Sequence, residues 1–335
     1  MRILVLIAKR LAWFVPTAAG LIAIVFVISR VIPSDPVAML AGETASREQV
    51  EALRAKLGLD RPLTVQLVDY YWQLLHGDHG TSIFTTRPVA EDLFARLPAT
   101  VELTIIAMIM AVVIGIPFGV ISALRRNSLL DHTLRIVSVG GLAVACFWLA
   151  LILQLIFAMD LGWLPLQGRI SGFPPSPVTG FMTIDAILAG RWDRLGDALL
   201  HLCLPAITLA VPALATVVRF TRAGVLDTLQ KPFVTYQSAI GIPRPLIVWK
   251  YVLRNALTST ITQIGLLFGI LLAGAVVIET VFQWPGIGSY AFDAILQSDY
   301  AGVMGFTVYA GGIFMLVNLA VDITHEIIDP RGGRA

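Results

Sequence analysis

Charged residues are scarce in this chain. Only 14% of its 335 residues are Asp, Glu, Lys or Arg, whereas 57% are hydrophobic, and the mean hydropathy is +0.80. Soluble domains carry about 25% charged residues, so this composition excludes an ordinary soluble domain and indicates an integral membrane protein. The formal net charge of +2 gives no sign of a nucleic-acid-binding surface.

Cysteine is rare in this chain, and a phosphate-binding motif for ATP is missing from it. The two cysteines, Cys146 and Cys203, lie in or beside apolar runs without metal-ligand spacing, so they predict neither a disulfide nor a metal site. No Gly-x-x-x-x-Gly-Lys-Ser/Thr segment occurs, so the chain lacks the loop that cradles the phosphates of ATP. Any nucleotide chemistry must therefore belong to a partner, and we expect no cofactor in this chain.

The spacing of the histidines does not indicate a metal-binding or catalytic site. His325-Glu326 resembles the start of a metalloprotease helix, but Asp329 stands where the second histidine is required. His76 and His79 flank Asp78 in a glycine-rich loop, where exposure to solvent is favoured over metal binding. The expected catalytic and metal sites are therefore none.

Long apolar runs are abundant. A membrane-spanning helix needs about 20 mainly apolar residues. The sequence predicts an all-α membrane protein with six such helices, at 11–32, 100–124, 136–159, 202–220, 258–281 and 303–321. Three domains are expected: the N-terminal segment with the first transmembrane helix (1–32), a small helical extracytoplasmic insertion (33–98) and a transmembrane domain (99–335) that contains five helices and a cytoplasmic coupling loop (221–255).

Basic residues predict the orientation. Loops on the cytoplasmic side carry an excess of Lys and Arg, whereas long translocated segments escape this rule. With the N-terminus inside, the inner set is Arg2, Lys9, Arg10, Arg125, Arg126, Arg135, Arg219, Arg222, Lys231, Arg244, Lys250, Arg254, Arg331 and Arg334. Both termini are therefore expected in the cytoplasm of a bacterium, with the chain crossing the inner membrane several times.

The middle of the apolar runs lacks ionisable side chains. Glu102, Arg219, Glu279 and Asp322 all lie near the ends of runs. Because ionisable groups inside a membrane mark proton and ion paths, a proton-driven carrier is disfavoured.

Three neutral polar residues do occur in mid-run. Gln154, Gln263 and Asn318 are candidates for a translocation path, and each of them could instead form hydrogen bonds between helices.

The insertion at 33–98 carries helix signals. Ser46 and Gln49 form a capping box, and Gly58 is expected to end the first helix. A second helix should begin near Pro62 and end at Gly77. Its apolar stripe is Leu63, Leu67, Tyr70, Tyr71 and Leu74. We expect these helices to form a cap on the outer face of the membrane domain.

The segment 221–255 between the fourth and fifth runs is basic and broken. Pro232 and Gly241-Ile242-Pro243 should divide it into short helices with a sharp corner. A solvated linker has no reason to carry Tyr236, Trp249 and Tyr251. The shape suits docking onto another protein.

This segment resembles the coupling loop of bacterial ABC importer permeases. The signature of that loop is Glu-Ala-Ala, three residues, Gly, nine residues and Ile-x-Leu-Pro. Gly241 and Leu253 match it, and Arg254-Asn255-Ala256-Leu257 is similar to the dipeptide, oligopeptide and nickel branch. Tyr236 and Gln237 stand where the family has alanine. Further landmarks of the branch are 57–62, 77–82, 97–100, 161–165, 279–288 and 329–331.

The resemblance implies a type I ABC importer transmembrane fold and its partners. These are a second homologous permease, one or two ATPases that bind ATP and Mg, an extracytoplasmic binding protein and the lipid bilayer. The implied ATPase-coupling residues are Phe233, Tyr236, Gln237, Ser238, Ala239, Gly241, Leu253, Arg254 and Asn255. Short peptides lead as the implied cargo, with nickel, glutathione and opines open. A self-sufficient channel or secondary carrier is the alternative from another class.

Several local expectations complete this picture. Phe282 and Trp284 suit a membrane interface, and the outer loop at 160–201 is a candidate to enter the binding protein, with a simple surface connection as the alternative. Ala145 replaces the proline that usually precedes the Phe-Trp pair in the third span of this family. The Gly-x-x-x-Gly pairs at 115–119 and 265–269 predict close packing, within the chain or against a second permease.

Overall fold

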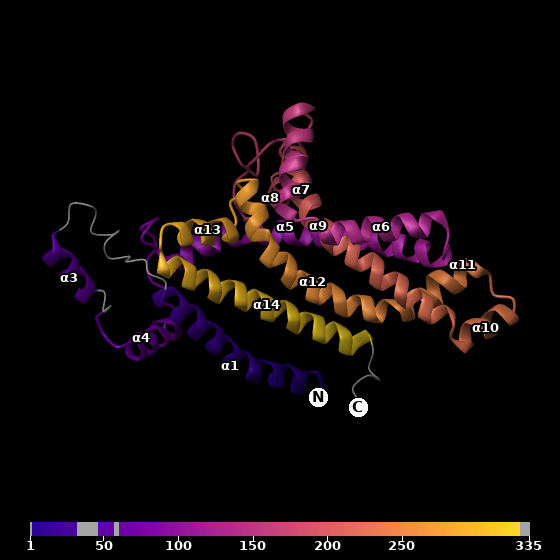
Figure 1. The fold of residues 1–335 in the computed structure, drawn as a ribbon, viewed down its shortest axis with the longest axis horizontal. Coiled ribbons are helices and arrows are strands. Elements are labelled where there is room, and N and C mark those ends of the chain that lie inside the picture. Colours follow the sequence, from indigo (N-terminus) through magenta and orange to yellow (C-terminus); the bar gives the residue numbers. More distant parts are fainter. Residues whose placement is uncertain (1, 32–45, 57–59, 329–335) are drawn as a thin grey trace.

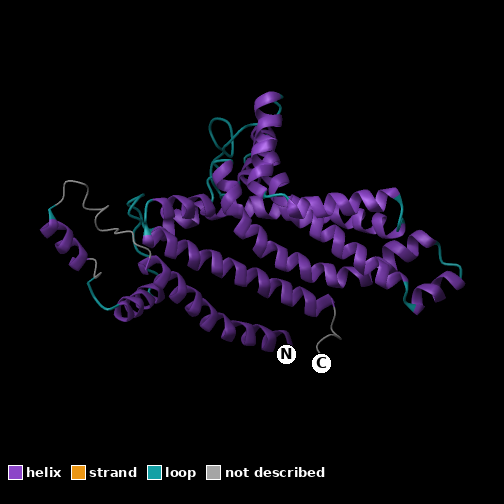
Figure 2. Ribbon diagram, in the orientation of Figure 1, coloured by secondary structure: helices purple, strands orange, loops and turns teal. Residues whose placement is uncertain are grey.

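The computed structural model describes residues 2–31, 46–56 and 60–328 (Figure 1). The described residues form helices and loops, without a strand among them (Figure 2). The predicted all-α class is therefore confirmed. Five long helices follow the long axis of the molecule: α1 (Arg2–Val31), α5 (Val89–Leu124), α9 (Trp192–Leu229), α12 (Leu253–Val281) and α14 (Tyr300–Ile328).

The bundle has two distinct ends. At one end, on the right of Figure 1, α9 and α12 are joined through α10 (Pro232–Ala239) and α11 (Arg244–Leu246); we call this the α10 end. At the other, the α13 end, lie α13 (Ile287–Leu296), α4 (Leu63–Leu75) and α3 (Arg47–Lys56). The two ends carry different kinds of contact.

The number of membrane spans differs from the expected six. Four helices in the described part are long and apolar enough to cross a membrane, at Val89–Leu124, Trp192–Leu229, Gln263–Val281 and Tyr300–Val321. A bent pair of helices would make five, and the apolar part of α1, Ala12–Ile28, is shorter than a full span. Six spans are therefore not confirmed.

The expected span at 136–159 is not one continuous helix. The chain forms α6 (Leu129–Ala143) and then α7 (Cys146–Leu153) with the π-helical η1 (Gln154–Asp160), and the two parts meet at 103°. Val144 and Ala145 are extended, with ψ angles of 126° and 127°. No proline imposes this bend. Instead, burial of Ala150 in the core and the hydrogen bond from Gln154 to the Val281 carbonyl favour a new direction for α7.

Small residues bring the long helices close together. Buried alanines from α5 and α9 form much of the main core, together with Leu209, Leu271 and Ile278. A Cβ on Gly119 would overlap Thr221 of α9, and one on Gly269 would overlap Phe314 of α14. Both Gly-x-x-x-Gly pairs therefore pack within the chain, where they let helix backbones approach.

The insertion begins as the sequence predicts. Ser46 N–H donates to Gln49 Oε1 at 3.0 Å, and Gln49 N–H donates to Ser46 Oγ at 3.3 Å, which completes the capping box before α3. The expected stop at Gly58 lies outside the described residues. Pro62 precedes α4, and Gly77 follows it with a positive φ of 78°.

The boundary expected at residue 98 falls inside a helix. α5 begins at Val89 and continues through Pro98 to Leu124. Its start is fixed by tertiary contacts, since Val89 and Leu93 are fully buried against Ile287 and Tyr290 of α13. The division of the chain at 32 and 98 stays a prediction.

Candidate functional site

The connection between α9 and α12 has the broken form that the sequence predicts. α10 begins with Pro232 at its first turn, where the missing N–H costs no hydrogen bond. It ends at Gly241, which has a φ of 80°, and the Ile242 N–H donates to the Gln237 carbonyl at 3.1 Å. Glycine is needed for this left-handed corner. α11 and the π-helical η2 (Ile247–Val252) then lead directly into α12.

One face of this connection is anchored to the bundle. Val234 of α10 and Val248 of η2 are buried with Val120 of α5 and Val225 of α9, and Phe233 and Leu253 pack against this cluster. Burying such a side chain contributes about 1.5–3 kcal/mol in water-accessible surroundings. We call this set the anchor cluster; its buried members are Val120, Ala123, Val225, Val234, Ile247, Val248, Val252 and Ala256.

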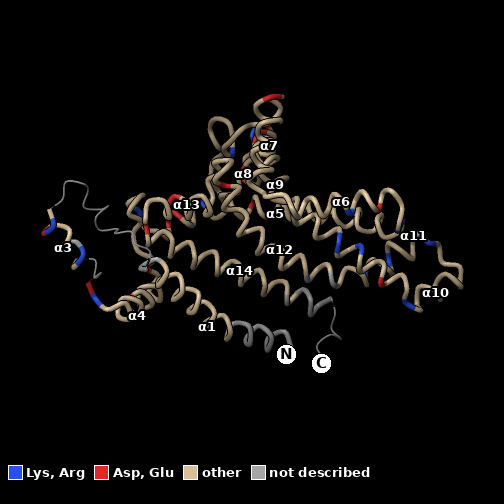
Figure 3. Tube along the Cα trace, in the orientation of Figure 1, with Lys and Arg blue, Asp and Glu red and all other residues tan. Residues whose placement is uncertain are grey.

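The other face is open. Tyr236 is 66% exposed, and Trp249, Ile240 and Leu246 are also exposed. Ser238 and Ala239 are exposed beside Tyr236, whereas Gln237 is partly buried. Lys and Arg gather around this end of the molecule (Figure 3). Exposed aromatic side chains ringed by cations are typical of a protein-binding surface.

The last two expected coupling residues lie at the base of α12. Arg254 is exposed. Asn255 is also exposed, and its Nδ2 donates to the Tyr251 carbonyl at 2.8 Å, which ties η2 to the first turn of α12. The nine expected residues are thus distributed between the anchored face and the open face.

Sequence reasoning missed an ion pair behind the coupling segment. Asp131, at the start of α6, is fully buried and accepts from Arg222 of α9 at 2.8 Å (Nε) and 2.9 Å (Nη2). Ser122 Oγ and the Asn127 N–H donate to the same carboxylate at 2.5 and 3.0 Å. The only sequence signal is Ser128, which caps α6 by accepting from the Asp131 N–H. The pair links the α5–α6 turn to the base of α9.

The three candidate path residues do not meet. Gln154 Nε2 donates to the carbonyls of Leu166 and Val281, at 2.9 and 3.3 Å, so its amide serves interhelical bonding. Gln263 and Asn318 are partly buried in α12 and α14. At about 1.5 Å per residue, Gln263 lies roughly 27 Å along α12 from Val281. Gln154 is therefore far from Gln263.

The α13 end contains two buried carboxylates, Glu102 and Glu279. The sequence placed both near the ends of apolar runs and gave them no role. Glu102 of α5 pairs with Arg169 and accepts from the Thr183 N–H and hydroxyl at 2.8 and 2.6 Å. Glu279 of α12 accepts from Thr100 Oγ1 at 2.5 Å and from the Ser289 N–H at 2.9 Å. These contacts fasten the loops before α8 and after α12 to α5 and α12.

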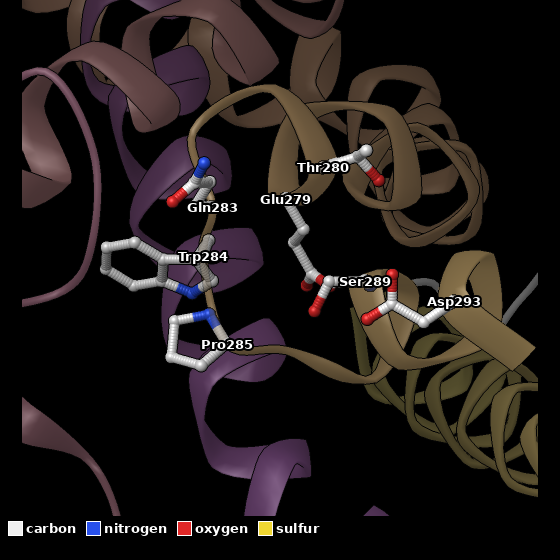
Figure 4. A pocket seen from close by; sticks show the side chains of 7 residues that line it. All are labelled: Glu279, Thr280, Gln283, Trp284, Pro285, Ser289 and Asp293. Atoms are coloured by element: carbon white, nitrogen blue, oxygen red, sulfur yellow. Dashed lines mark hydrogen bonds between the residues drawn. The ribbon is translucent and has the colours of Figure 1, made fainter. Parts of the chain in front are cut away.

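The loop after α12 contains Phe282 and Trp284, which the sequence predicts at a membrane interface, and this prediction is wrong. Phe282 and Trp284 are buried in the core and do not face a membrane interface. The Trp284 Nε1–H donates to the Ala99 carbonyl at 2.9 Å, which satisfies the indole in the interior. A pocket of about 220 Å³ opens beside this loop, lined by Glu279, Thr280, Gln283, Trp284, Pro285, Ser289 and Asp293 (Figure 4). The Glu279 carboxylate is already engaged by its donors there.

The loop at 161–181, expected from the sequence to lie outside, is irregular but well bonded. Asp185 of α8 (Met182–Leu188) accepts from the N–H groups of Thr179 and Gly180 at 2.7 and 3.0 Å, and from the Thr179 hydroxyl at 2.7 Å. Burial raises the pKa of the Asp185 carboxyl, but these hydrogen bonds lower it more, so its pKa lies below the ordinary value. The loop is therefore held in one shape.

Apolar helices around a core of small residues, joined by a broken loop with one anchored and one open face, agree with the membrane subunit of a transporter. The chain belongs to the family of binding-protein-dependent transport system inner membrane components, whose profile matches residues 115–333. The N-terminal profile of the same transport systems matches residues 3–104. The chain is thus an ABC importer permease and a multi-pass inner-membrane protein.

Curated relatives match nearly the whole chain. The probable D,D-dipeptide transport system permease protein DdpB of Escherichia coli K12 is 45% identical over 331 residues, covering 98% of this chain and 97% of the relative. The dipeptide transport system permease protein DppB of Alkalihalophilus pseudofirmus is 39% identical over 326 residues, covering 96% and 97%.

A solved structure shares the fold. The inward-facing MetNI methionine ABC transporter matches with a TM-score of 0.52 and 17% identity, covering 69% of this chain and 93% of that one. This likeness supports the type I importer architecture.

Proposed function

We propose that this chain carries di- or oligopeptides across the inner membrane as the permease subunit of an ATP-driven importer. The names of the dipeptide permeases that match it over nearly its full length support this cargo. A glutathione permease of Pectobacterium atrosepticum at 35% identity keeps glutathione as a second candidate. Nickel and opines stay open in the same branch.

We propose that the exposed face of α10 couples transport to ATP hydrolysis by binding an ATPase. A separate ATPase binds around Tyr236, with Phe233 holding α10 to the bundle and Gly241 turning the chain away. ATP and Mg bind to that partner, and this chain has no enzymatic site of its own. At about 1.5 Å per residue, α10 is a foot roughly 12 Å long, which is enough to fill a shallow cleft.

The orientation follows from the same surface. Lys231, Arg244, Lys250 and Arg254 lie at the α10 end (Figure 3), and cytoplasmic loops are the ones enriched in Lys and Arg. We place the α10 end in the cytoplasm. α1 begins and α14 finishes toward that end in Figure 1, which supports cytoplasmic termini.

The remaining partners belong to the opposite end and to the flank of the bundle. An extracytoplasmic binding protein delivers the peptide to the α13 end, where the loop at 161–181 is a candidate contact. A second homologous permease completes the pathway, and one or two ATPases drive it. Gln263 and Asn318 stay candidates for the path, whereas the amide of Gln154 is already used.

The test is Gly241→Val, assayed for peptide uptake and for copurification of the ATPase. A β-branched residue is strained at the φ of 80°, so both should fall together. Gly190→Val is the matched control, because Gly190 has a φ of 66° and open space around it but lies in the turn before α9. Unchanged uptake and assembly in Gly241→Val would refute the docking role.

Reconstitution separates the proposal from a self-sufficient channel or carrier. Vesicles that hold this chain alone should take up no peptide, and flux should appear only with the companion permease, the ATPase, ATP and the binding protein. Flux through the chain alone would favour the alternative. Competition among dipeptides, glutathione and nickel in the complete system would then identify the cargo.

A further inference from the structure

One face of α4 is exposed in the part of the chain that the structure describes. Val68, Trp72 and Leu75 are 66%, 66% and 80% exposed, and Val65 beside them is also exposed. Their spacing places them on one side of the helix. A continuous apolar face of this kind marks a contact with a membrane or another protein.

The opposite face of α4 packs on the apolar part of α1 and on α14. Tyr70 and Leu74 lie in a cluster with Ile22 and Phe26 of α1 and Met304 of α14. The Tyr71 hydroxyl donates to the Ala19 carbonyl at 2.5 Å. Ala19, Ile22 and Phe26 all belong to the apolar stretch Ala12–Ile28, and Met304 belongs to the span Tyr300–Val321.

These contacts place α4 beside apolar helices. Val308 of α14 packs in the same cluster, and it belongs to the apolar stretch Tyr300–Val321, which is long enough to cross a membrane. The inner face of α4 therefore joins an apolar cluster that continues into a candidate membrane span.

A third side of α4 is polar. Asp69, Gln73 and His76 are exposed there, and Asp69 pairs with Arg61 at 3.3 Å. The His76 ring lies 4.6 Å from the Trp72 ring, at the border of the polar and apolar sides. A helix with an apolar face, an adjoining polar face and tryptophan at the border is typical of the membrane interface.

We infer that α4 is an interfacial helix whose outer face, formed by Val65, Val68, Trp72 and Leu75, lies against phospholipid of the leaflet at the α13 end. In the proposed orientation this is the outer leaflet. The apolar face continues the lipid-facing surface of α1, where Ile24 and Ile28 are exposed. α4 is thus not part of a water-exposed cap, and only its polar side meets water and headgroups.

Spin-label accessibility tests the inference on the assembled transporter in phosphatidylcholine nanodiscs. Val68→Cys and Leu75→Cys are labelled in a Cys146→Ala, Cys203→Ala background, with Gln73→Cys as the matched control on the polar side. Labels at 68 and 75 should collide with oxygen and be shielded from a water-soluble nickel chelate, and the label at 73 should show the reverse. Equal exposure of all three to the nickel chelate would overturn the inference.

The binding protein offers a second reading that the same labels decide. If its addition shields positions 68 and 75 while these sites are open to the nickel chelate beforehand, the face docks protein and the lipid assignment is wrong. The unsubstituted chain supplies an independent measurement. A phosphatidylcholine with a diazirine near its ester groups should label residues 65–75 after illumination. The inference would be contradicted if the lipid labelled the membrane spans but did not label α4. The outcome does not depend on ATP or on the cargo, so it can fail while the proposed function holds.

Discussion

The two ends of the bundle are held by different forces. At the α10 end, the buried Asp131–Arg222 ion pair and the apolar anchor cluster secure a segment whose far side is exposed. At the α13 end, buried carboxylates bind loop N–H groups and hydroxyls, so that Glu102, Asp185 and Glu279 each receive several donors. The comparison fits the proposed coupling role of the α10 end, and it shows hydrogen-bonded loops at the other end.

This difference has a physical basis. Apolar contacts are not directional, so the anchor cluster can tilt with the base of α9 and α12 and still keep its burial. Hydrogen bonds weaken steeply when their geometry changes, so the loops at the α13 end have one favoured arrangement. The following substitutions test the contrast, in order of decreasing effect.

Glu102→Leu should have the largest effect on stability. It leaves Arg169 nearly buried without its carboxylate, and breaking such a pair costs about 3–5 kcal/mol. Thermal unfolding of the purified protein measures this loss. Arg61→Ala is the control, because Arg61 and Asp69 are both exposed and the pair contributes less than about 1 kcal/mol. Equal losses in both variants would show that the α13 end does not depend on buried carboxylates.

Asp131→Asn should cost less stability but should affect coupling. It removes the charge while keeping the shape, and a hydrogen bond to a charged group contributes about 1.5–3 kcal/mol. Because Asp131 ties the α5–α6 turn to Arg222 at the base of α9, peptide uptake should fall more than ATP hydrolysis does. The uptake per ATP hydrolysed is the measurement.

A double-mutant cycle controls this prediction. Arg222→Gln in the Asp131→Asn background removes the unpaired cation, so it should restore part of the lost stability. Strict additivity of the two changes would mean that the pair makes no specific contribution. A parallel fall of uptake and hydrolysis would remove Asp131 from the coupling route.

Much of the secondary structure could be predicted from the sequence because its signals are local. The capping box at Ser46 and Gln49, the start of α10 at Pro232 and the corner at Gly241 all depend on neighbouring residues. The bend at Val144 and Ala145 could not be predicted, since it carries no proline or glycine and arises from the packing of α7 on α12.

The candidate site was predictable only on its open face. Exposed Tyr236 stands out in the sequence, whereas the partner of Arg222 lies 91 residues away and depends on the tertiary fold. Trp284 shows the same limit. An aromatic residue beside a turn suits a membrane interface by composition, but only the fold reveals the Ala99 carbonyl that satisfies its indole in the core.

Tyr236→Ala should change assembly without changing stability. The side chain is 66% exposed, so its removal leaves no cavity, but truncating an aromatic contact at an interface costs more than about 1 kcal/mol. Affinity for the ATPase should therefore fall about tenfold. Phe233→Ala is the control, because Phe233 packs on the anchor cluster and its loss should lower the thermal stability. Undiminished ATPase affinity in Tyr236→Ala would move the docking surface elsewhere.

Acidification should produce the smallest effect, and we expect it in the loop that the Asp185 carboxylate holds. The pKa of Asp185 is lowered in the folded protein because donors from Thr179 and Gly180 outweigh the effect of burial. The stabilisation is complete above the ordinary pKa of the carboxyl, and it is lost as the pH falls through the lowered folded pKa. Hydrogen exchange at 178–185 should therefore accelerate, after correction for the intrinsic pH dependence, only below about pH 4. Asp185→Asn should exchange faster already at neutral pH and lack this acid step; an unchanged acid step in the variant would assign the transition to another carboxylate.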